Sequence, residues 1–254
     1  VHPSLHLAQV RYEIRGALAR RARALEAAGH AVLKLNIGNP GRFGFRAPAH
    51  LTAAITGHLA GSDAYGHEQG LEPARAAILA QQRGRGADVP DIERIFIGNG
   101  VSELIDLALR VLLNAGDEVL LPAPDYPLWS AATILNAGVP RYYACPASRA
   151  HLPDPDEIQA LCSPRTRAIV LVNPNNPTGA CYPRELLERI VAVAGRRGLL
   201  LLSDEIYDDI RYDGAPFTPL ASLAGDLPCV TFAGLSKVHR ACGFRIGWAT
   251  LSGG

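Results

Sequence analysis

Methionine is missing from this chain, and lysine is nearly so. None of the 254 residues is Met, position 1 included, and only Lys34 and Lys237 among the 25 basic residues are lysines. The absent initiator residue predicts a non-Met start codon or a start inside a longer reading frame. Because arginine supplies the charge everywhere else, the two remaining lysines need an explanation.

Long apolar runs are also lacking. No stretch approaches the roughly 20 residues that a membrane-spanning helix needs. Arginines interrupt the N-terminal region, where a signal peptide would have its apolar core. We therefore expect no membrane partner and no secretory signal. The net charge of +1 provides no basic field, so we expect no nucleic-acid partner either.

Cysteine is present but does not form a pattern. The five cysteines are odd in number and never occur as CxxC, which argues against a disulfide framework and against a zinc site. Scattered thiols are typical of the reducing cytoplasm, so we expect a cytoplasmic protein without a metal. The five positions are Cys145, Cys162, Cys181, Cys229 and Cys242.

The order of elements predicts an α/β fold. Residues 5–28 have the periodicity of a helix, residues 32–37 that of a short strand, and residues 48–60 and 71–84 that of further helices. From about residue 94, apolar strands alternate with helices, which is typical of a mostly parallel seven-stranded sheet in a three-layer α-β-α arrangement. The expected strands are Arg94–Gly98, Glu118–Leu121, Arg141–Ala144, Ala168–Val172, Leu199–Leu202, Val230–Ala233 and Arg245–Leu251. The expected helices between them are Ser102–Leu113, Leu128–Asn136, Pro155–Leu161 and Pro183–Arg197.

Lys237 follows the apolar strand Val230–Ala233 in the string Gly-Leu-Ser-Lys. Strand carboxyl ends are where α/β sheets place their ligand sites. A desolvated lysine can become a neutral amine and attack a carbonyl, whereas arginine stays protonated at any working pH. The retained lysine therefore indicates Schiff-base chemistry, although a single surface lysine by itself would mean nothing.

Other expected strand ends carry unusual polar loops. Gly98-Asn99-Gly100 leads into a helix whose exposed amides suit a phosphate. Residues 173–179 read Asn-Pro-Asn-Asn-Pro-Thr-Gly, and two prolines stiffen such a loop so that it can hold an amide against a ligand oxygen. Asp204 ends a buried strand, where an acid needs a cation or hydrogen bonds. Capping a helix is the competing interpretation of Asp204.

Arg245 lies eight residues after Lys237, with Gly243 and Gly247 beside it as signs of a close backbone approach. An arginine fork binds a phosphate through two hydrogen bonds. An amine, an acid for a ring nitrogen, an amide and a phenol for a ring oxygen, and a phosphate cradle together fit pyridoxal 5′-phosphate. The acid is Asp204, and the loop at residues 173–179 supplies the amide.

The sequence closely resembles the fold-type-I, class I/II aminotransferases that use pyridoxal 5′-phosphate. The resemblance extends over essentially the whole chain and is strongest to the alanine (glutamate–pyruvate) group. It rests on the strings at residues 35–40 (Leu-Asn-Ile-Gly-Asn-Pro), 97–104 (Ile-Gly-Asn-Gly-Val-Ser-Glu-Leu), 122–129 (Pro-Ala-Pro-Asp-Tyr-Pro-Leu-Trp), 173–179 and 234–248.

This resemblance implies a role for each residue of the predicted site. Lys237 would carry the cofactor as a Schiff base, Asp204 would pair with the pyridinium nitrogen, and Tyr126 would stack on the ring. Asn176 and Tyr207 would hydrogen-bond the ring hydroxyl, so Lys237, Asp204 and Tyr207 are the expected catalytic residues. The other implied contacts are Gly100, Val101, Ser102, Ser236 and Arg245 at the phosphate, Tyr65 at the phosphate of the neighbouring subunit of a homodimer, and Gly38 with Asn176 near the substrate.

The same resemblance predicts the reaction and the domains. It implies transamination between amino acids and 2-oxo acids, with alanine and 2-oxoglutarate giving pyruvate and glutamate. Residues 1–45 are expected to belong to a small domain and residues 46–254 to form the cofactor-binding domain, with the C-terminal part of the small domain cut away. Two alternatives remain open. One is a fragment or cofactor-binding module without turnover, and the other is a carbon–sulfur β-lyase of the same fold.

Overall fold

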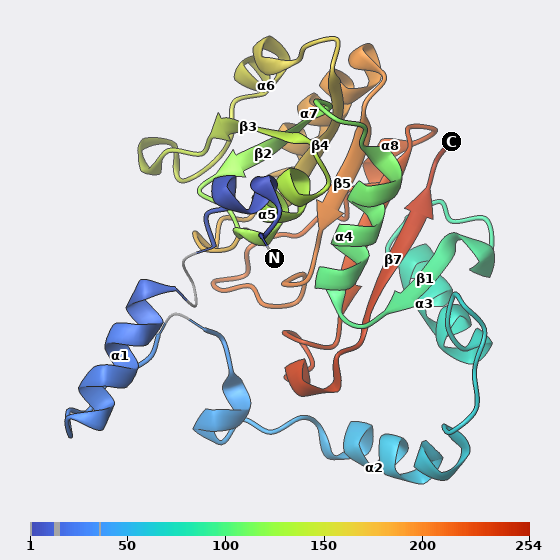
Figure 1. Cartoon of the computed structure of the whole chain (residues 1–254). Coiled ribbons are helices and arrows are strands. Elements are labelled where there is room, and N and C mark those ends of the chain that lie inside the picture. Colours follow the sequence, from blue (N-terminus) through green and yellow to red (C-terminus); the bar gives the residue numbers. More distant parts are fainter. Residues whose placement is uncertain (1, 13–15, 36) are drawn as a thin grey trace.

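The computed structural model describes residues 2–12, 16–35 and 37–254, and Figure 1 shows a central twisted sheet with helices packed against it. The described residues form one seven-stranded sheet in the order β1-β7-β6-β5-β4-β2-β3. Neighbouring strands are parallel except that β7 runs antiparallel to both β1 and β6. The strands are β1 (Ile95–Gly98), β2 (Glu118–Ala123), β3 (Val139–Ala144), β4 (Thr166–Val172), β5 (Leu200–Asp204), β6 (Cys229–Gly234) and β7 (Gly247–Ser252).

Helices cover both faces of this sheet. On one face, α4 (Val101–Leu112) and α5 (Leu128–Leu135) pack against alternate residues of the central strands, such as Leu202 and Phe232. On the other face, residues from four further helices surround Leu201 and Ile95. Those helices are α3 (Glu72–Gly84), α6 (Pro155–Leu161), α7 (Arg184–Arg197) and α8 (Ala221–Ala224). The predicted three-layer α/β class is confirmed: the central strands are buried almost continuously along their length, as strands with helices on both faces are.

The strand register brings the predicted site loops to one edge of the sheet. In the central strands, Val172 pairs with Asp204, and Asp204 pairs with Phe232. These three strands are parallel, so the segments that follow them leave the sheet side by side. The loop 173–179, the turn after Asp204 and the segment that carries Lys237 therefore meet at this edge.

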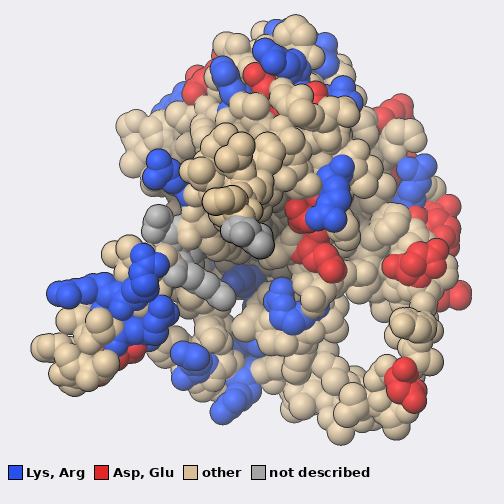
Figure 2. Space-filling view, in the orientation of Figure 1, with Lys and Arg blue, Asp and Glu red and all other residues tan. Residues whose placement is uncertain are grey.

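Much of the chain before α3 lies apart from the sheet. We call residues 2–71 the N-terminal arm and residues 72–254 the sheet body. The described part of the arm contains α1 (Ala17–Ala27) and α2 (Ala49–His58), which Figure 1 shows extending away from the sheet. Figure 2 shows basic residues gathered on the arm and a hollow between it and the body. The arm also has short 3-10 turns at Leu5–Gln9, Pro40–Phe43 and Leu59–Gly61.

Two predictions for the arm are wrong. The single helix expected over residues 5–28 is a 3-10 turn at Leu5–Gln9 followed by α1 from Ala17, because Val10 is extended and ends the turn. Residues 13–15 of that prediction lie outside the described chain. Residues 32–35 and 37 form no strand, and residue 36 also lies outside. A strand needs a partner for its backbone groups, and this segment does not reach the sheet.

All seven expected strands of the body start or end one or two residues away from the prediction. The last expected strand began at Arg245, but β7 begins at Gly247, because Arg245 has a left-handed backbone with φ of 57°. The third strand begins at Val139 and the second extends to Ala123. None of the helices in the described ranges is long and apolar enough to cross a membrane.

Candidate active site

Asp204 is a buried acid at the end of the central strand β5, and only 3% of its surface is exposed. Its Oδ2 accepts a hydrogen bond from the Trp129 indole at 3.1 Å, and its Oδ1 accepts one from the Ile206 amide at 3.3 Å. Burial raises the pKa of Asp204 to about 6, although these hydrogen bonds and the charge of Lys237 lower it. Among the described residues Asp204 forms no ion pair, so a cationic ligand group would find an available carboxylate.

Lys237 lies at the same edge as Asp204. Its Nζ sits 5.7 Å from the centre of the Tyr207 ring, and Tyr207 belongs to the turn that follows Asp204. The N-terminal arm also reaches Lys237, since a Cβ placed on Gly38 would lie 3.8 Å from Nζ. The structure therefore brings together Gly38, Tyr207 and Lys237, which are far apart in the sequence and were predicted to share a site.

The Asn-Pro loop holds its third asparagine toward this group. Asn173 accepts from the Tyr182 amide and Asn175 accepts from Thr178, so these two side chains stabilise the loop itself. Asn176 instead donates from Nδ2 to the Tyr207 hydroxyl at 3.5 Å. Two asparagines thus stabilise the loop and the third faces the site, which explains why a seven-residue loop contains three of them.

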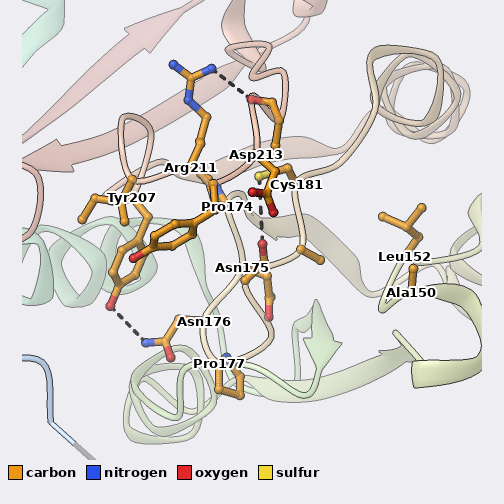
Figure 3. Close-up of a pocket in the computed structure, with 15 residues that line it drawn as sticks. Ala150, Leu152, Pro174, Asn175, Asn176, Pro177, Cys181, Tyr207, Arg211 and Asp213 are labelled. Atoms are coloured by element: carbon orange, nitrogen blue, oxygen red, sulfur yellow. Dashed lines mark hydrogen bonds between the residues drawn. The ribbon is translucent and has the colours of Figure 1, made fainter.

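A cavity of about 580 Å³ adjoins this loop, and Asn176 and Tyr207 lie in its wall. Figure 3 shows these two side chains pointing toward one another at one end of the cavity, with Arg211 and Asp213 at the other. Lys237 and Asp204 do not line the cavity. It therefore flanks the candidate site on the outer side of the Asn-Pro loop rather than containing the reacting groups.

Burial raises the pKa of the Tyr207 hydroxyl to about 12, and the charge of Asp204 acts in the same direction. Tyr207 is therefore a protonated phenol at neutral pH. Such a phenol can donate a hydrogen bond to an anionic oxygen, as the Asn176 amide also can. Two donors held side by side suit one negatively charged ligand oxygen.

The predicted phosphate turn is formed where three glycines lie in register. Gly98 at the end of β1 and Gly234 at the end of β6 both pair with Gly247 of β7. A Cβ on Gly247 would lie 2.5 Å from the Val101 nitrogen and 2.7 Å from the carbonyl carbon of Gly100. A side chain there would push away the turn, so the small residue allows the backbone of the turn to pack on β7.

This turn opens the helix α4, and Gly100 is its N-cap with φ of 82°. Val101 and Ser102 follow as the first helical residues, where backbone N–H groups have no partner within the helix and the helix dipole is positive. Any side chain on Gly100 would collide with the Arg245 guanidinium. The turn, the start of the helix and the arginine thus converge on one point.

Arg245 is exposed and reaches this turn from the segment that precedes β7. Its guanidinium donates to the Cys242 carbonyl at 2.9 Å and to the Asn99 carbonyl at 3.3 Å. The expected close backbone approach is right for Gly247 and wrong for Gly243, which has open space around its Cα. Ser236 lies partly buried on the segment between β6 and Arg245.

Two residues near the site carried no predicted role. Trp129, in the first turn of α5, donates to Asp204, and its place at the end of the 122–129 string was the one signal that could have revealed it. Tyr12 of the N-terminal arm lies with its hydroxyl 3.2 Å from that of Tyr126. No pattern around Tyr12 indicates this contact, because it depends on how the arm folds back onto α5.

Tyr126 follows β2, and burial raises the pKa of its hydroxyl well above the usual value, with Tyr12 acting in the same direction. Tyr65 lies in the arm and is fully exposed. It does not contribute to the site of its own chain. All five cysteines are free thiols, and the described residues contain no group of three or more His, Cys, Asp or Glu side chains that could hold a metal.

Comparison with known proteins identifies the family. The profile of "Aminotransferase class I and II" matches residues 31–253. The chain belongs to the class I and II aminotransferases. The family depends on pyridoxal 5′-phosphate, which is the cofactor that the residue inventory predicted.

Curated relatives of this aminotransferase chain are similar to it along its whole length. The glutamate-pyruvate aminotransferase AlaA of Escherichia coli K12 is 49% identical over 253 residues, which are 100% of this chain and 62% of AlaA. The alanine aminotransferase of Mycobacterium tuberculosis H37Rv is 46% identical, over 98% of this chain and 58% of that protein. The chain therefore spans about three fifths of the relatives it matches.

Solved aminotransferases share the fold. An aminotransferase from Escherichia coli superposes with a TM-score of 0.97 at 49% identity, over 100% of this chain and 63% of that one. Alanine aminotransferase from Pyrococcus furiosus gives 0.93 at 36% identity, over 98% and 63% of the two chains. The resemblance predicted from the sequence is thus confirmed for the family and for the fold.

The described residues fit the family's cofactor chemically. Asp204 is a buried carboxylate that forms no ion pair with a described residue, and a protonated ring nitrogen could supply that partner. The Gly100 turn and Arg245 form a cradle of donors that a single Cβ on Gly100 would block. The aminotransferase chain therefore has an acceptor and donors of the kinds that the two ends of pyridoxal 5′-phosphate require.

Proposed function

We propose that this chain is the cofactor-binding part of an aminotransferase that exchanges the amino group between alanine and 2-oxoglutarate, giving pyruvate and glutamate. The names of the relatives at 49% and 46% identity support this pair of substrates. One observation supports the chemistry above all others. Lys237, one of two lysines in the chain, lies beside Tyr207 at the sheet edge where the buried carboxylate of Asp204 forms no ion pair with a described residue.

Bound pyridoxal 5′-phosphate supplies an aldehyde that takes up the amino group and a ring that accepts the electron pair left at Cα. In our proposal Asp204 stays ionised against the protonated ring nitrogen and so keeps that ring a strong electron acceptor. Lys237 would be the residue that holds the cofactor through its aldehyde carbon. Its side-chain amine, when free, would serve as the base that accepts the proton of the substrate Cα.

The Asn176 amide and the Tyr207 phenol are the proposed donors to the ring oxygen. Their mutual hydrogen bond of 3.5 Å and the raised pKa of Tyr207 support this role, because both groups remain donors at neutral pH. Tyr126 is proposed to lie against the ring face. Its hydroxyl, 3.2 Å from that of Tyr12, would fix the angle of its ring.

The phosphate is proposed to bind where α4 begins. Backbone amides at a helix N-terminus and an arginine fork together suit a doubly charged group. Gly38, close to Nζ of Lys237, is proposed to approach the substrate together with Asn176. The complete proposed phosphate set is Gly100, Val101, Ser102, Ser236 and Arg245, with Tyr65 contributed to the neighbouring subunit.

The domain division, assembly and location are further parts of this proposal. We assign residues 1–45 to a small domain and residues 46–254 to the cofactor-binding domain. In the described chain the first buried residue is Arg75, which supports separating residues 1–45 from the cofactor-binding domain. Residues 46–71 bury no side chain either. We propose a cytoplasmic homodimer with a role in amino-acid biosynthesis, in keeping with five unpaired thiols.

The test uses the 254-residue chain as it is. Addition of pyridoxal 5′-phosphate should produce a yellow absorbance that borohydride bleaches, and mass spectrometry should then find the reduced cofactor on Lys237. A coupled assay with alanine and 2-oxoglutarate measures turnover. Yellow protein without turnover would favour a cofactor-binding module, and pyruvate with ammonia in the absence of a 2-oxo acid would favour a β-lyase. Absence of any adduct on Lys237 would overturn the proposal.

A further inference from the structure

The turn that carries Tyr207 is tied to a helix on the far side of the sheet body. We propose that the ion pair between Arg85 and Asp208 is a positioning device that holds the turn 205–210 and, through it, the Tyr207 hydroxyl beside Asn176. Neither Arg85 nor Asp208 would touch cofactor or substrate. The inference rests on the proposed function in one respect, namely that the Tyr207 hydroxyl serves the cofactor.

Arg85 is the C-cap residue of α3, and its side chain forms ion pairs with two consecutive acidic residues of the turn. Its guanidinium pairs with Asp208 through one nitrogen and with Asp209 through another, the latter at 3.2 Å. Asp208 is buried, and Arg85 is largely covered. A covered ion pair resists separation, because removal of one partner leaves the other charge poorly solvated. The pair is therefore a firm link rather than a surface contact.

The turn itself has few other restraints on this side. Its own backbone bonds join Asp208 to Glu205 at 3.0 Å and Ile210 to Tyr207 at 2.8 Å. Asp208 also accepts from the Asp209 amide through Oδ1 at 2.8 Å. These contacts give the turn its shape, but they do not fix it to the rest of the molecule. The Arg85 link supplies that attachment at the end of the turn.

Glu205 supplies the attachment at the start of the turn. Its buried carboxylate accepts from the Ser203 hydroxyl at 2.9 Å and from the Leu220 amide at 3.0 Å, both through Oε1. Its backbone amide donates to the carbonyl of Phe232 in β6 at 2.8 Å. Tyr207 therefore lies between two anchors, one on the sheet and the other on α3.

The helix that provides the second anchor is itself immobilised. Arg75 of α3 is 3% exposed and donates to the carbonyls of Gly70 and Ile92, each at 3.1 Å. Ile78, one turn further on, packs against Ile95 of β1. Arg75 thus ties α3 to the segments just before α3 and β1, and Ile78 packs it against the sheet, so Arg85 at its end belongs to a helix that is anchored at two points.

A small displacement of the turn would matter at Tyr207. The bond from Asn176 to the Tyr207 hydroxyl is 3.5 Å long, which is the outer limit for a hydrogen bond. The same ring lies 5.7 Å from Nζ of Lys237. If the Arg85 link is lost, the hydroxyl should spend less time at the shared position, and one of the two proposed donors to the ring oxygen should weaken.

The experiment compares Arg85→Gln, which removes the charge, with Arg85→Lys, which keeps it. The control is Arg83→Gln, at the same end of α3, because Arg83 donates to the carbonyls of Val89 and Pro90 and does not reach the turn. Without cofactor, hydrogen exchange of amides 205–210 is measured. With pyridoxal 5′-phosphate, the pH midpoint of the yellow absorbance and the Kd are measured.

Arg85→Gln should speed exchange in residues 205–210. A donor at the ring oxygen competes with the proton of the cofactor–lysine group for that oxygen, so its weakening should raise the pH midpoint. We expect a rise of about 0.5–1 pH unit, the effect of partly losing one hydrogen bond, and a Kd about 3–10-fold weaker. Arg85→Lys should restore much of the difference, and Arg83→Gln should leave the exchange and the midpoint unchanged.

Unchanged exchange in the Arg85→Gln turn, or an equal midpoint shift in Arg83→Gln, would overturn the inference. If Arg85→Gln fails to fold, Asp208→Asn removes the same charge pair with almost no change in volume and carries the same expectations. A wild-type chain that never turns yellow refutes the proposed function instead. In that case the exchange measurement still decides whether Arg85 holds the turn.

Discussion

The sheet body and the N-terminal arm both contain amphipathic helices, but they differ in burial. In the body, α4 places Leu104, Ile105 and Leu109 in a core with the central strands. In the described part of the arm no residue is buried, and Leu18 of α1 is 75% exposed. A helical pattern of apolar residues therefore predicts a helix in both regions but a core in only one of them.

The difference in burial shows that the two regions are stabilised in different ways. Most of a helix's stability in a protein comes from packing of its apolar face rather than from its intrinsic propensity. The body supplies that packing from residues within the described chain. The arm exposes large apolar side chains, which are Leu5, Leu7, Leu18, Leu33, Leu35, Ile37, Phe43, Phe45, Leu59, Tyr65 and Leu71. Exposure on this scale is typical of a surface that another body covers.

The largest expected effect lies in the body and concerns chemistry. Lys237→Arg should lose transamination by at least about 1,000-fold, because arginine can neither attack the aldehyde nor carry the Cα proton. The coupled alanine assay measures turnover, and mass spectrometry after borohydride measures the adduct. Lys34→Arg is the matched control in the arm and should behave as wild type. Appreciable turnover by Lys237→Arg would contradict the assignment.

A pair of identical substitutions tests the contrast in burial. Leu109→Ala in α4 removes a fully buried side chain and should cost about 2–5 kcal/mol of unfolding free energy. Leu18→Ala in α1 removes an exposed one and should change stability by less than about 0.5 kcal/mol. Denaturant unfolding monitored by tryptophan fluorescence measures both.

The Leu18→Ala variant can contradict the contrast in burial between the arm and the body. If Leu18→Ala costs as much as Leu109→Ala, the arm is covered in solution. Repeating the measurement over a range of protein concentrations then shows whether a second copy provides the cover, because stability from association rises with concentration.

Asp204 predicts a pH dependence specific to the body. Its folded pKa of about 6 lies above the ordinary value of 3.8, so the folded state holds the proton to a higher pH than the unfolded chain does. The stabilisation is complete below about pH 4 and is lost as the pH rises to about 6, a change of about 3 kcal/mol. Asp204→Asn should remove this component from the stability profile of the cofactor-free protein.

The difference between wild type and Asp204→Asn isolates the effect, since Asp125 and Glu205 also have pKa values raised by burial to about 7. Pyridoxal 5′-phosphate should abolish the Asp204 component, because a protonated ring nitrogen would keep the carboxylate ionised to lower pH. A component that persists in the loaded protein would argue against a cation at Asp204.

The sequence predicts the body far better than the arm, and the reason is physical. Strands such as Ala168–Val172 are continuous apolar runs that can be stable only inside a covered sheet, so their positions are constrained by composition alone. The expected strand at 32–37 has apolar residues at strand spacing too, but its described residues pair with no strand. Local pattern cannot tell these two situations apart, because pairing is a property of the whole fold.

The candidate site divides in the same way. Lys237, Asp204 and Asn176 follow strands, so the topology of a parallel sheet is enough to bring their loops to one edge. The contact of Trp129 with Asp204 had one signal, the place of Trp129 at the end of the 122–129 string, and that of Tyr12 with Tyr126 had none. The first depends on the angle at which α5 packs, and the second on the path of the arm, neither of which is written in a local motif.

Tyr65→Phe is the smallest change and tests the arm most sharply. The Tyr65 side chain is fully exposed in the single chain, so loss of one hydroxyl should leave the unfolding free energy unchanged within about 0.5 kcal/mol. In the proposed homodimer the same hydroxyl would donate to the phosphate held by the neighbouring subunit, and its loss should weaken cofactor affinity about 3–10-fold. Titration of the yellow absorbance below and above the dimer's dissociation concentration separates the two cases. Weaker binding only where the dimer forms would give the arm a part in the site. If the cofactor affinity of the variant equals that of wild type at every concentration, Tyr65 makes no cofactor contact. All cofactor contacts would then lie within the sheet body and its neighbour Gly38.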